Sequence, residues 1–192
     1  MQKRLRWLLV VTIMVVLVVG FYYIQNNKSD SPEDLKENLI SDVDKIINKD
    51  LDESYPYTAR EVVQYFVRIQ KCYYNEEYTE EELVKLAYKA TELFDDELNN
   101  ENDFDDYFEL LKAEIELYHT QGKVINSVIM DEYSEIVYST VDGQKYASIN
   151  CTYFLRSDDG TTKIPETYIL RKDEAGRWKI LGWKEYEENE WE

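Results

Sequence analysis

The sequence predicts an α+β domain, with helices on one face of an antiparallel sheet, behind an N-terminal transmembrane helix. Three observations lead to this fold class. Residues 7–24 are apolar and uncharged, residues 58–122 repeat apolar side chains at helical spacing, and residues 123–185 alternate as strands do. Because helices come first and strands follow, we expect the two kinds of element in separate layers.

The apolar segment at residues 7–24 follows the basic residues Lys3, Arg4 and Arg6. As a helix rising ~1.5 Å per residue it would span about 27 Å, close to the ~30 Å hydrocarbon core of a bilayer. Since positive charge flanks only its amino side, we expect residues 1–6 in the cytoplasm and the rest of the chain outside. The prediction is a single-pass protein of the cell membrane.

A cleaved signal peptide is the competing interpretation of this segment. Residues 18–20 would tolerate cleavage after Gly20. The apolar run continues to Ile24, however, and is longer than the usual signal core of 7–15 residues, which favours an uncleaved anchor. With no Cys near the end of the run, a lipoprotein is excluded. In either case the folded part is extracytoplasmic.

Beyond the anchor, Ser31 and Pro32 form a helix-start signal. The residues after them that recur at helical spacing are Leu35, Leu39, Val43 and Ile46. A short helix at this position would either rest on the domain or act as a spacer. Along the chain we therefore expect a cytoplasmic basic segment over residues 1–6, the signal anchor over 7–24, an acidic connector with room for one short helix over 25–56, an extracytoplasmic domain over 57–186 and an acidic tail over 187–192.

Composition and charge exclude several classes of function. The chain has 192 residues, with 22 Lys and Arg against 40 Asp and Glu, and a formal net charge of −18. Nucleic-acid binding depends on basic residues that neutralise phosphates, so we expect no nucleic-acid partner. One His and two Cys leave no His-based metal cluster and no disulfide-rich scaffold. We expect neither a metal nor a cofactor.

Three helices are predicted between residues 58 and 122. Thr58 with Glu61 and Thr79 with Glu82 are capping boxes that start the first two. The third begins at Asn102 or Asp103 and ends near Gly122. The apolar faces comprise Val62, Phe66, Ile69 and Tyr73 in the first, Leu83, Leu86, Ala90, Leu93 and Phe94 in the second, and Phe104, Phe108, Leu111, Ile115 and Tyr118 in the third.

A meander of strands is predicted after Gly122. Asp142 and Gly143 mark a two-residue hairpin. The strands expected beyond it cover residues 144–156, 162–171 and 177–185. In the last of these Trp178 and Trp183 fall on opposite faces, and Gly182 between them is expected to mark a bulge or bend.

Two pairs of segments carry a family resemblance. Residues 168–173 (YILRKD) and 176–183 (GRWKILGW), after three helices, resemble the nuclear transport factor two-like superfamily. Residues 55–63 (YPYTAREVV) and 71–79 (KCYYNEEYT) look like an uncharacterised family of membrane-anchored proteins of Gram-positive gut anaerobes, over about residues 50–185. The resemblance implies a cone-shaped α+β domain outside the membrane. It implies no reaction, because that superfamily holds both enzymes and non-catalytic modules.

Glu166 is the acidic residue that falls on an inward position of the predicted sheet. Tyr153, Tyr168 and Trp178 are expected to line a pocket with it. Burial among apolar neighbours would raise the pKa of Glu166, as suits a general acid or base. Two alternatives remain open: Pro165 can disturb the strand and turn Glu166 outward, or Glu166 can pair with a basic neighbour. The three aromatic residues can equally be packed in the hydrophobic core without lining a pocket.

Other candidate groups favour structural roles. His119 is placed to interact with the C-terminus of the third helix. Residues 95–106 are rich in carboxylates but lack the Gly and the final Glu of a calcium-binding loop, which favours a solvated connection between helices. Cys72 and Cys151 fall at core positions and are either buried thiols or one disulfide.

The function predicted from the sequence is a non-catalytic binding or assembly module, with a protein partner or a second copy of itself. The alternative is a small-molecule-binding protein or enzyme that uses the cone pocket, with Glu166 as its acid–base group. That alternative requires a closed, largely apolar cavity at Glu166, and an interior filled by Tyr and Trp would argue against it. A third hypothesis, a wall-associated spacer, needs neither cavity nor partner.

Overall fold

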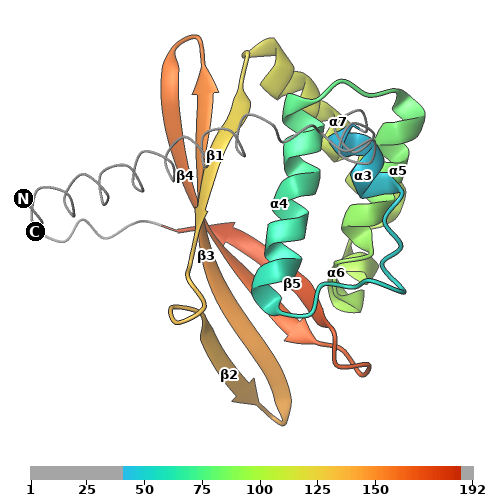
Figure 1. The fold of residues 1–192 in the computed structure, drawn as a ribbon, viewed down its shortest axis with the longest axis vertical. Helices are drawn as coiled ribbons and strands as arrows, with labels where there is room; N and C mark the ends of the chain where they lie inside the picture. Colours follow the sequence, from blue (N-terminus) through green and yellow to red (C-terminus); the bar gives the residue numbers. More distant parts are fainter. Residues whose placement is uncertain (1–40, 187–192) are drawn as a thin grey trace, which may run out of the picture. The chain divides into compact units, whose positions relative to one another are not determined.

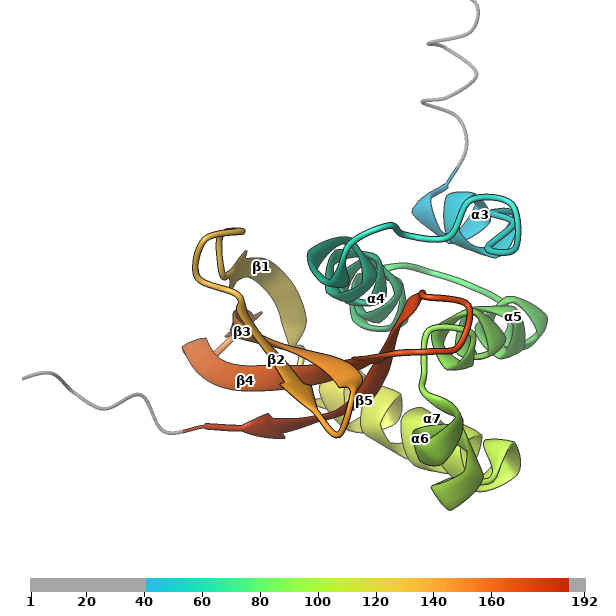
Figure 2. The same cartoon turned by 90° about the horizontal axis from the view of Figure 1, so that it is seen from below.

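The computed structural model describes residues 41–186, and the fold within them is α+β. The elements in chain order are α3 Asp42–Ile47, α4 Ala59–Asn75, α5 Glu80–Thr91, α6 Asp96–Glu101, α7 Phe104–Thr120, β1 Val124–Met130, β2 Val137–Val141, β3 Gln144–Ser157, β4 Gly160–Lys172 and β5 Trp178–Glu185. The helices gather on one side of an antiparallel sheet (Figures 1 and 2). The predicted layer arrangement is confirmed.

Both predicted capping boxes are present at the starts of α4 and α5. The Glu61 backbone N–H donates to Thr58 Oγ1 at 3.2 Å, and the Thr58 N–H donates to the Glu61 carboxylate at 2.9 Å. Thr79 and Glu82 form the same pair, with N–H to carboxylate at 2.7 Å. Reciprocal bonds of this kind satisfy backbone donors that a helix start leaves unpaired. They fix where each helix begins.

The segment expected to be a solvated connection contains a short helix, α6. Asp95 is its N-cap and accepts from the Glu97 N–H at 2.9 Å. Asp103 caps α7 in the same way, accepting from the Asp105 N–H at 2.9 Å. Two of the carboxylates that resembled calcium ligands therefore serve as helix caps, and the expected connection between helices is itself helical over Asp96–Glu101.

The strands form one sheet in the order β1, β3, β4, β5, and β2 also pairs with β3. β1 pairs with the second half of β3 and β2 with its first half, while β4 runs along the whole of β3. The hairpin between β2 and β3 is confirmed. Asp142 and Gly143 have φ of 52° and 81°, the positive values that a two-residue type I′ turn requires.

The pairing of β4 with β5 contains the bulge that the sequence predicted near Gly182. Ile169 lies opposite Gly182, and the next residue of β4, Leu170, lies opposite Ile180. Leu181 is thus an extra residue without a partner in the ladder. One extra residue reverses the face of every side chain beyond it relative to a regular strand.

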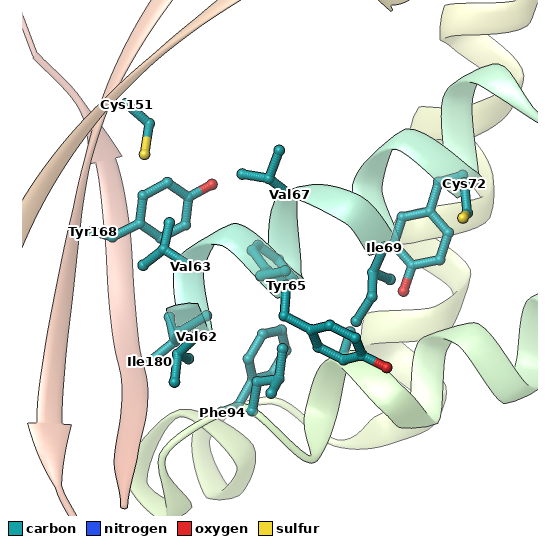
Figure 3. Packing of buried hydrophobic residues seen from close by; sticks show 14 of the residues in the cluster. Val62, Val63, Tyr65, Val67, Ile69, Cys72, Phe94, Cys151, Tyr168 and Ile180 are labelled. Carbon is teal, nitrogen blue, oxygen red and sulfur yellow. The ribbon is translucent and has the colours of Figure 1, made fainter. Parts of the chain in front are cut away.

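The core lies between α4 and the inner face of the sheet. Figure 3 shows Tyr168 and Cys151 of the sheet facing Val63 and Val67 of α4. All four side chains are buried. The inward alternation predicted for β3 and β4 is confirmed by the buried side chains Ala147, Ile149, Cys151, Tyr153, Leu155, Tyr168 and Leu170.

The compact unit begins earlier than predicted, at Asp42 rather than at residue 57. Val43 and Ile46 of α3 are buried, and the Tyr65 hydroxyl of α4 donates to the Ile46 carbonyl at 3.2 Å. Of the two alternatives for this short helix, the structure shows that it rests on the domain, so the domain boundary lies before α3. Its burial depends on contacts with α4 and α5 that are distant in sequence.

Several predicted segments lie outside the described residues. These are the basic segment 1–6, the anchor 7–24, most of the connector and the tail 187–192. Among residues 41–186, none of the helices has the length and apolar character needed to cross a bilayer.

Candidate functional site

Glu166 lies at one end of a series of hydrogen-bonded side chains on the face of the sheet that is turned toward α4. The Tyr168 hydroxyl lies 2.8 Å from a Glu166 carboxyl oxygen, at hydrogen-bond distance. The Tyr168 and Tyr153 hydroxyls are 2.8 Å apart, and the Tyr153 hydroxyl lies 2.6 Å from the side-chain amide of Gln70 on α4. Glu166 therefore faces inward, and Pro165 does not turn it away. This series ties β4 through β3 to α4.

These three contacts need three hydrogens, whereas the two phenols supply only two. The third hydrogen comes either from a protonated Glu166 or from the Gln70 amide, whose nitrogen and oxygen can exchange places. In the first arrangement Glu166 donates to Tyr168 and the series ends at the Gln70 oxygen. The proton state of Glu166 thus sets the direction of the whole series of hydrogen bonds.

Burial is the main influence on the pKa of Glu166 and raises it above the ordinary value. The hydrogen bond with Tyr168 lowers the pKa in part, and the negative charges of Glu114 and Glu185 raise it further. Burial likewise raises the pKa of the Glu114 carboxyl on α7, although the Glu114 side chain reaches solvent, and a hydrogen bond with Tyr74 opposes that rise. Both carboxyls hold their protons more tightly than they would in water.

The cavity beside Glu166 is small, about 80 Å³. The residues that line it are Gln70, Tyr74, Glu114, Tyr118, Ile125, Tyr153, Leu155, Ile164, Glu166 and Trp183. Pockets that bind metabolites are usually several times larger, at about 300–1,000 Å³, and a water occupies about 30 Å³. Tyr and Trp side chains fill most of this interior, which leaves room for a few waters at Glu166.

A second cavity of about 340 Å³ lies between α6, α7 and β5. The residues that line it are Thr91, Phe94, Leu98, Asn99, Asn102, Tyr107, Leu110, Leu111, Glu114, Gly182 and Trp183. Glu114 and Trp183 also line the smaller cavity, so these two residues form the boundary between the two. We call the larger cavity, with its lining residues, the Trp183 pocket.

Trp183 is held at this boundary by other aromatic rings. Its ring centroid is 5.4 Å from that of Phe66, 5.8 Å from Phe94 and 5.9 Å from Tyr168. The side chain is 39% exposed, so one part is packed and another faces the pocket. An indole ring that packs against other aromatic rings and remains partly exposed offers an apolar surface to a ligand.

The chain matches a protein family over most of its length. Residues 1–183 match the family described as Domain of unknown function (DUF6715). The chain belongs to this family. The DUF6715 match includes the apolar segment at residues 7–24 as well as α3 to α7 and the strands up to Trp183. No curated protein matches the chain.

Three of the four residues predicted at the site of this DUF6715 domain lie together, and Trp178 does not. Glu166 and Tyr153 line the smaller cavity, and the Tyr168 hydroxyl lies at hydrogen-bond distance from Glu166. Trp178 lies at the start of β5 and lines neither cavity; its carbonyl accepts from the Tyr55 hydroxyl at 2.8 Å. The Leu181 bulge brings the later Trp183 to the inner face, which corrects the prediction for Trp178.

Glu114 and Trp183 are the functional candidates of the DUF6715 domain that sequence reasoning missed. Glu114 follows Leu111 by three residues and precedes Tyr118 by four, so it lies on the same side of the helix as the predicted apolar face. An acidic residue within an apolar helical face was the available signal. For Trp183 the available signal was Gly182, which indicated a bulge or bend in the last strand but not how many extra residues the strand contains.

A larger surface groove of about 690 Å³ lies at the other end of the sheet and is charged. Three of its four basic side chains have acidic or carbonyl partners: Arg171 contacts Asp95 and Glu97, Arg177 contacts Asp173 at 3.0 Å, and Lys179 contacts the Glu92 carbonyl. The ammonium group of the fourth, Lys172, lies 5.2 Å from the centroid of the Trp178 ring. Since these charges are compensated within the fold, we assign the groove a structural role.

The remaining candidates lie away from both cavities. His119 is exposed in the last turn of α7. Cys72 and Cys151 are buried free thiols at opposite sides of the cluster drawn in Figure 3, so the disulfide alternative is wrong for this structure. Residues 41–186 contain no group of three or more His, Cys, Asp or Glu side chains arranged to hold a metal ion.

Proposed function

We propose that this protein is a non-catalytic binding module, held outside the cell membrane by the apolar segment at residues 7–24, and that its ligand or partner inserts an apolar group into the Trp183 pocket. The observation that carries this proposal is the 340 Å³ volume of the pocket, with mainly apolar walls. Its size is in the range of small-ligand sites. Leu110, which lines the pocket, is 71% exposed and extends its apolar surface toward solvent.

The membrane part of the proposal is supported by the sequence. The apolar segment follows three basic residues, and the family match covers that segment together with the folded domain. The nuclear transport factor two-like relationship is also a proposal. The order of helices followed by an antiparallel meander supports it. A strongly acidic domain is repelled by anionic lipid headgroups, so we propose contact with the membrane through the anchor alone.

The alternative, catalysis or ligand binding at Glu166 itself, receives less support. The cavity there is about 80 Å³ and is lined by four large aromatic side chains. An organic substrate would have to displace several of them. We therefore prefer a role for Glu166 that supports the neighbouring pocket over a role as general acid or base.

A capture experiment with paired variants tests the binding function. The full-length tagged chain would be cross-linked on intact cells, solubilised and purified with its partners. Leu110→Glu places a charge at the pocket rim, whereas Leu117→Glu alters a residue of the same helix that is 52% exposed and lines neither cavity. We expect a discrete partner that is retained by Leu117→Glu and lost from Leu110→Glu.

The result that would overturn this proposal is equal recovery of the same proteins with both variants. If the recovered partner is a second copy of the chain, the binding module acts in self-association. Protease treatment of intact cells tests the topology separately, because a C-terminal tag outside the membrane is removed before lysis and a cytoplasmic tag is not.

A further inference from the structure

We infer that the Trp183 pocket recognises an organic ammonium ion that carries an apolar group, with the Glu114 carboxylate as its counter-ion. This inference rests on the proposed function, since it names the chemical class of the group that enters the same pocket. The ammonium ion can belong to a free amine or to a basic side chain of a partner. What the pocket recognises in both cases is one positive charge next to a hydrocarbon.

The charges around the pocket are of one sign. Glu114 lines both cavities and Glu166 lines the smaller one, and neither set of lining residues contains Lys, Arg or His. Two basic side chains on or just after α7 are directed elsewhere: Lys112 pairs with Glu109, and Lys123 lies 5.8 Å from the Tyr118 ring without lining either cavity. The carboxylate at the pocket boundary therefore has no cationic partner among the residues that line it.

The walls suit a cation as well as a hydrocarbon. Phe94 and Tyr107 pack edge to face with centroids 5.8 Å apart, and Trp183 adjoins Phe94 at the same distance of 5.8 Å. Aromatic faces within about 6 Å attract ammonium groups through the ring quadrupole, and Trp does so most strongly. The combination of an aromatic enclosure and a carboxylate is typical of ammonium recognition.

The alternatives for the ligand are less favourable. An anionic group would be repelled by Glu114 and Glu166 and by the net charge of −18 on the chain. A purely apolar group would bury more of the Glu114 carboxylate with the Tyr74 hydrogen bond alone and no cation to compensate its charge, which carries a free-energy cost. An ammonium group compensates that charge while its hydrocarbon fills the pocket.

Three probes that share a phenethyl group test the inference: phenethylammonium, its neutral isostere 2-phenylethanol, and the slightly larger anion 3-phenylpropionate. They would be titrated at pH 8 into the full-length chain in non-ionic detergent, labelled with ¹⁵N at its four Trp residues. The indole signal of Trp183 is assigned by its loss in Trp183→Phe. We expect phenethylammonium to bind about five- to tenfold more tightly than 2-phenylethanol, and the anion to bind least.

Glu114→Gln keeps the size of the side chain and removes its charge. The ratio of the affinity for phenethylammonium to that for 2-phenylethanol should therefore fall to about twofold or less. Glu116→Gln is the matched control, since Glu116 is exposed on the same helix and lines neither cavity. A peptide with one Lys between two Leu residues, compared with its acetyl-lysine form, then distinguishes a partner side chain from a free amine.

Equal affinity for phenethylammonium and 2-phenylethanol would overturn the inference while leaving the pocket as a binding site. An unchanged preference in Glu114→Gln would likewise overturn it, because the counter-ion would lie elsewhere. If no probe shifts the Trp183 signal, the inference fails, and the cross-linking experiment with the Leu110 and Leu117 variants decides separately whether the proposed function fails as well.

Discussion

Trp183 lies directly opposite Tyr168 on the neighbouring strand, with ring centroids 5.9 Å apart and ring planes 25° from parallel. This stacking depends on Leu181 remaining unpaired. If Leu181 were paired as in a regular strand, Trp183 would lie on the same face as Lys179, opposite to the face of Tyr168. A single extra residue in β5 therefore decides which tryptophan of the last strand lines the candidate site.

Deletion of Leu181 should remove the bulge and leave Trp183 opposite Tyr168, because Gly182 and Trp183 then follow Ile180 in regular register. We expect the aromatic cluster to be kept and the free energy of unfolding to fall by no more than about 1 kcal/mol. Trp183→Ala removes the ring from its neighbours and should cost at least about 2 kcal/mol. Urea unfolding followed by circular dichroism measures both changes; a deletion variant as unstable as Trp183→Ala would contradict this register.

The bulge illustrates how much of this fold the sequence predicts. The capping boxes at Thr58 and Thr79 and the turn at Asp142 act over a few residues, and local chemistry is sufficient to place them. Local patterns also predicted an inward Glu166. They could not predict which way Trp183 faces, because the number of extra residues in a strand is set by pairing with its neighbour.

Other errors have similar physical causes. α6 has no buried residues, so it lacks the apolar periodicity from which helices are predicted. α3 was assigned to the connector because its burial depends on α4 and α5. Glu114 was passed over because charged residues on a helix are normally exposed, and its position beside β5 follows from tertiary packing alone.

Replacement of Glu166 by Gln should change how stability depends on pH. Because burial raises the pKa of Glu166 in the folded state, the folded chain binds this proton more tightly than the unfolded chain. Its contribution to stability is therefore complete at acid pH and is lost as the pH rises through the folded-state pKa. Glu166→Gln stays neutral, so we expect it to equal the wild type near pH 4 and to be more stable, by roughly 1 kcal/mol, at pH 7.5.

Urea unfolding at the two pH values measures this difference. Glu116→Gln is the control for the loss of one negative charge from a strongly acidic chain, and the Glu166 effect is the excess over that control. If Glu166→Gln is less stable than the wild type at pH 7.5, the carboxylate stabilises the fold through its Tyr168 hydrogen bond more than its burial destabilises it.

Loss of the Arg171 side chain should destabilise the domain strongly. Arg171 donates to both carboxylate oxygens of Asp95, which is buried with only 4% of its surface exposed, and to Glu97 at 2.9 Å. Arg171→Met leaves a buried carboxylate without its partner, at a cost of about 2–4 kcal/mol. Lys85→Met breaks an exposed pair with Glu81 and should cost less than about 0.5 kcal/mol.

The comparison of these two variants by urea unfolding tests whether the charged groove is structural. A cost for Arg171→Met as small as that for Lys85→Met would show that the groove does not stabilise the fold. Its basic residues would then become candidates for binding an anion. Arg171→Lys should recover only part of the stability, because a lysine cannot form the two parallel bonds that the guanidinium makes with Asp95.

Both cysteines should be unreactive in the folded chain. Burial raises the pKa of the Cys72 and Cys151 thiols to about 12 in each case, so almost no thiolate is present at neutral pH. With Ellman's reagent at pH 8 we expect no rapid phase from the native full-length chain and two equivalents of thiol in guanidinium chloride. Two equivalents also distinguish free thiols from a disulfide, which would release none. A rapid native phase that disappears in Cys72→Ala, but not in Cys151→Ala, would show that the end of α4 opens to solvent, because Cys72 reaches reagent only when the packing of that helix loosens.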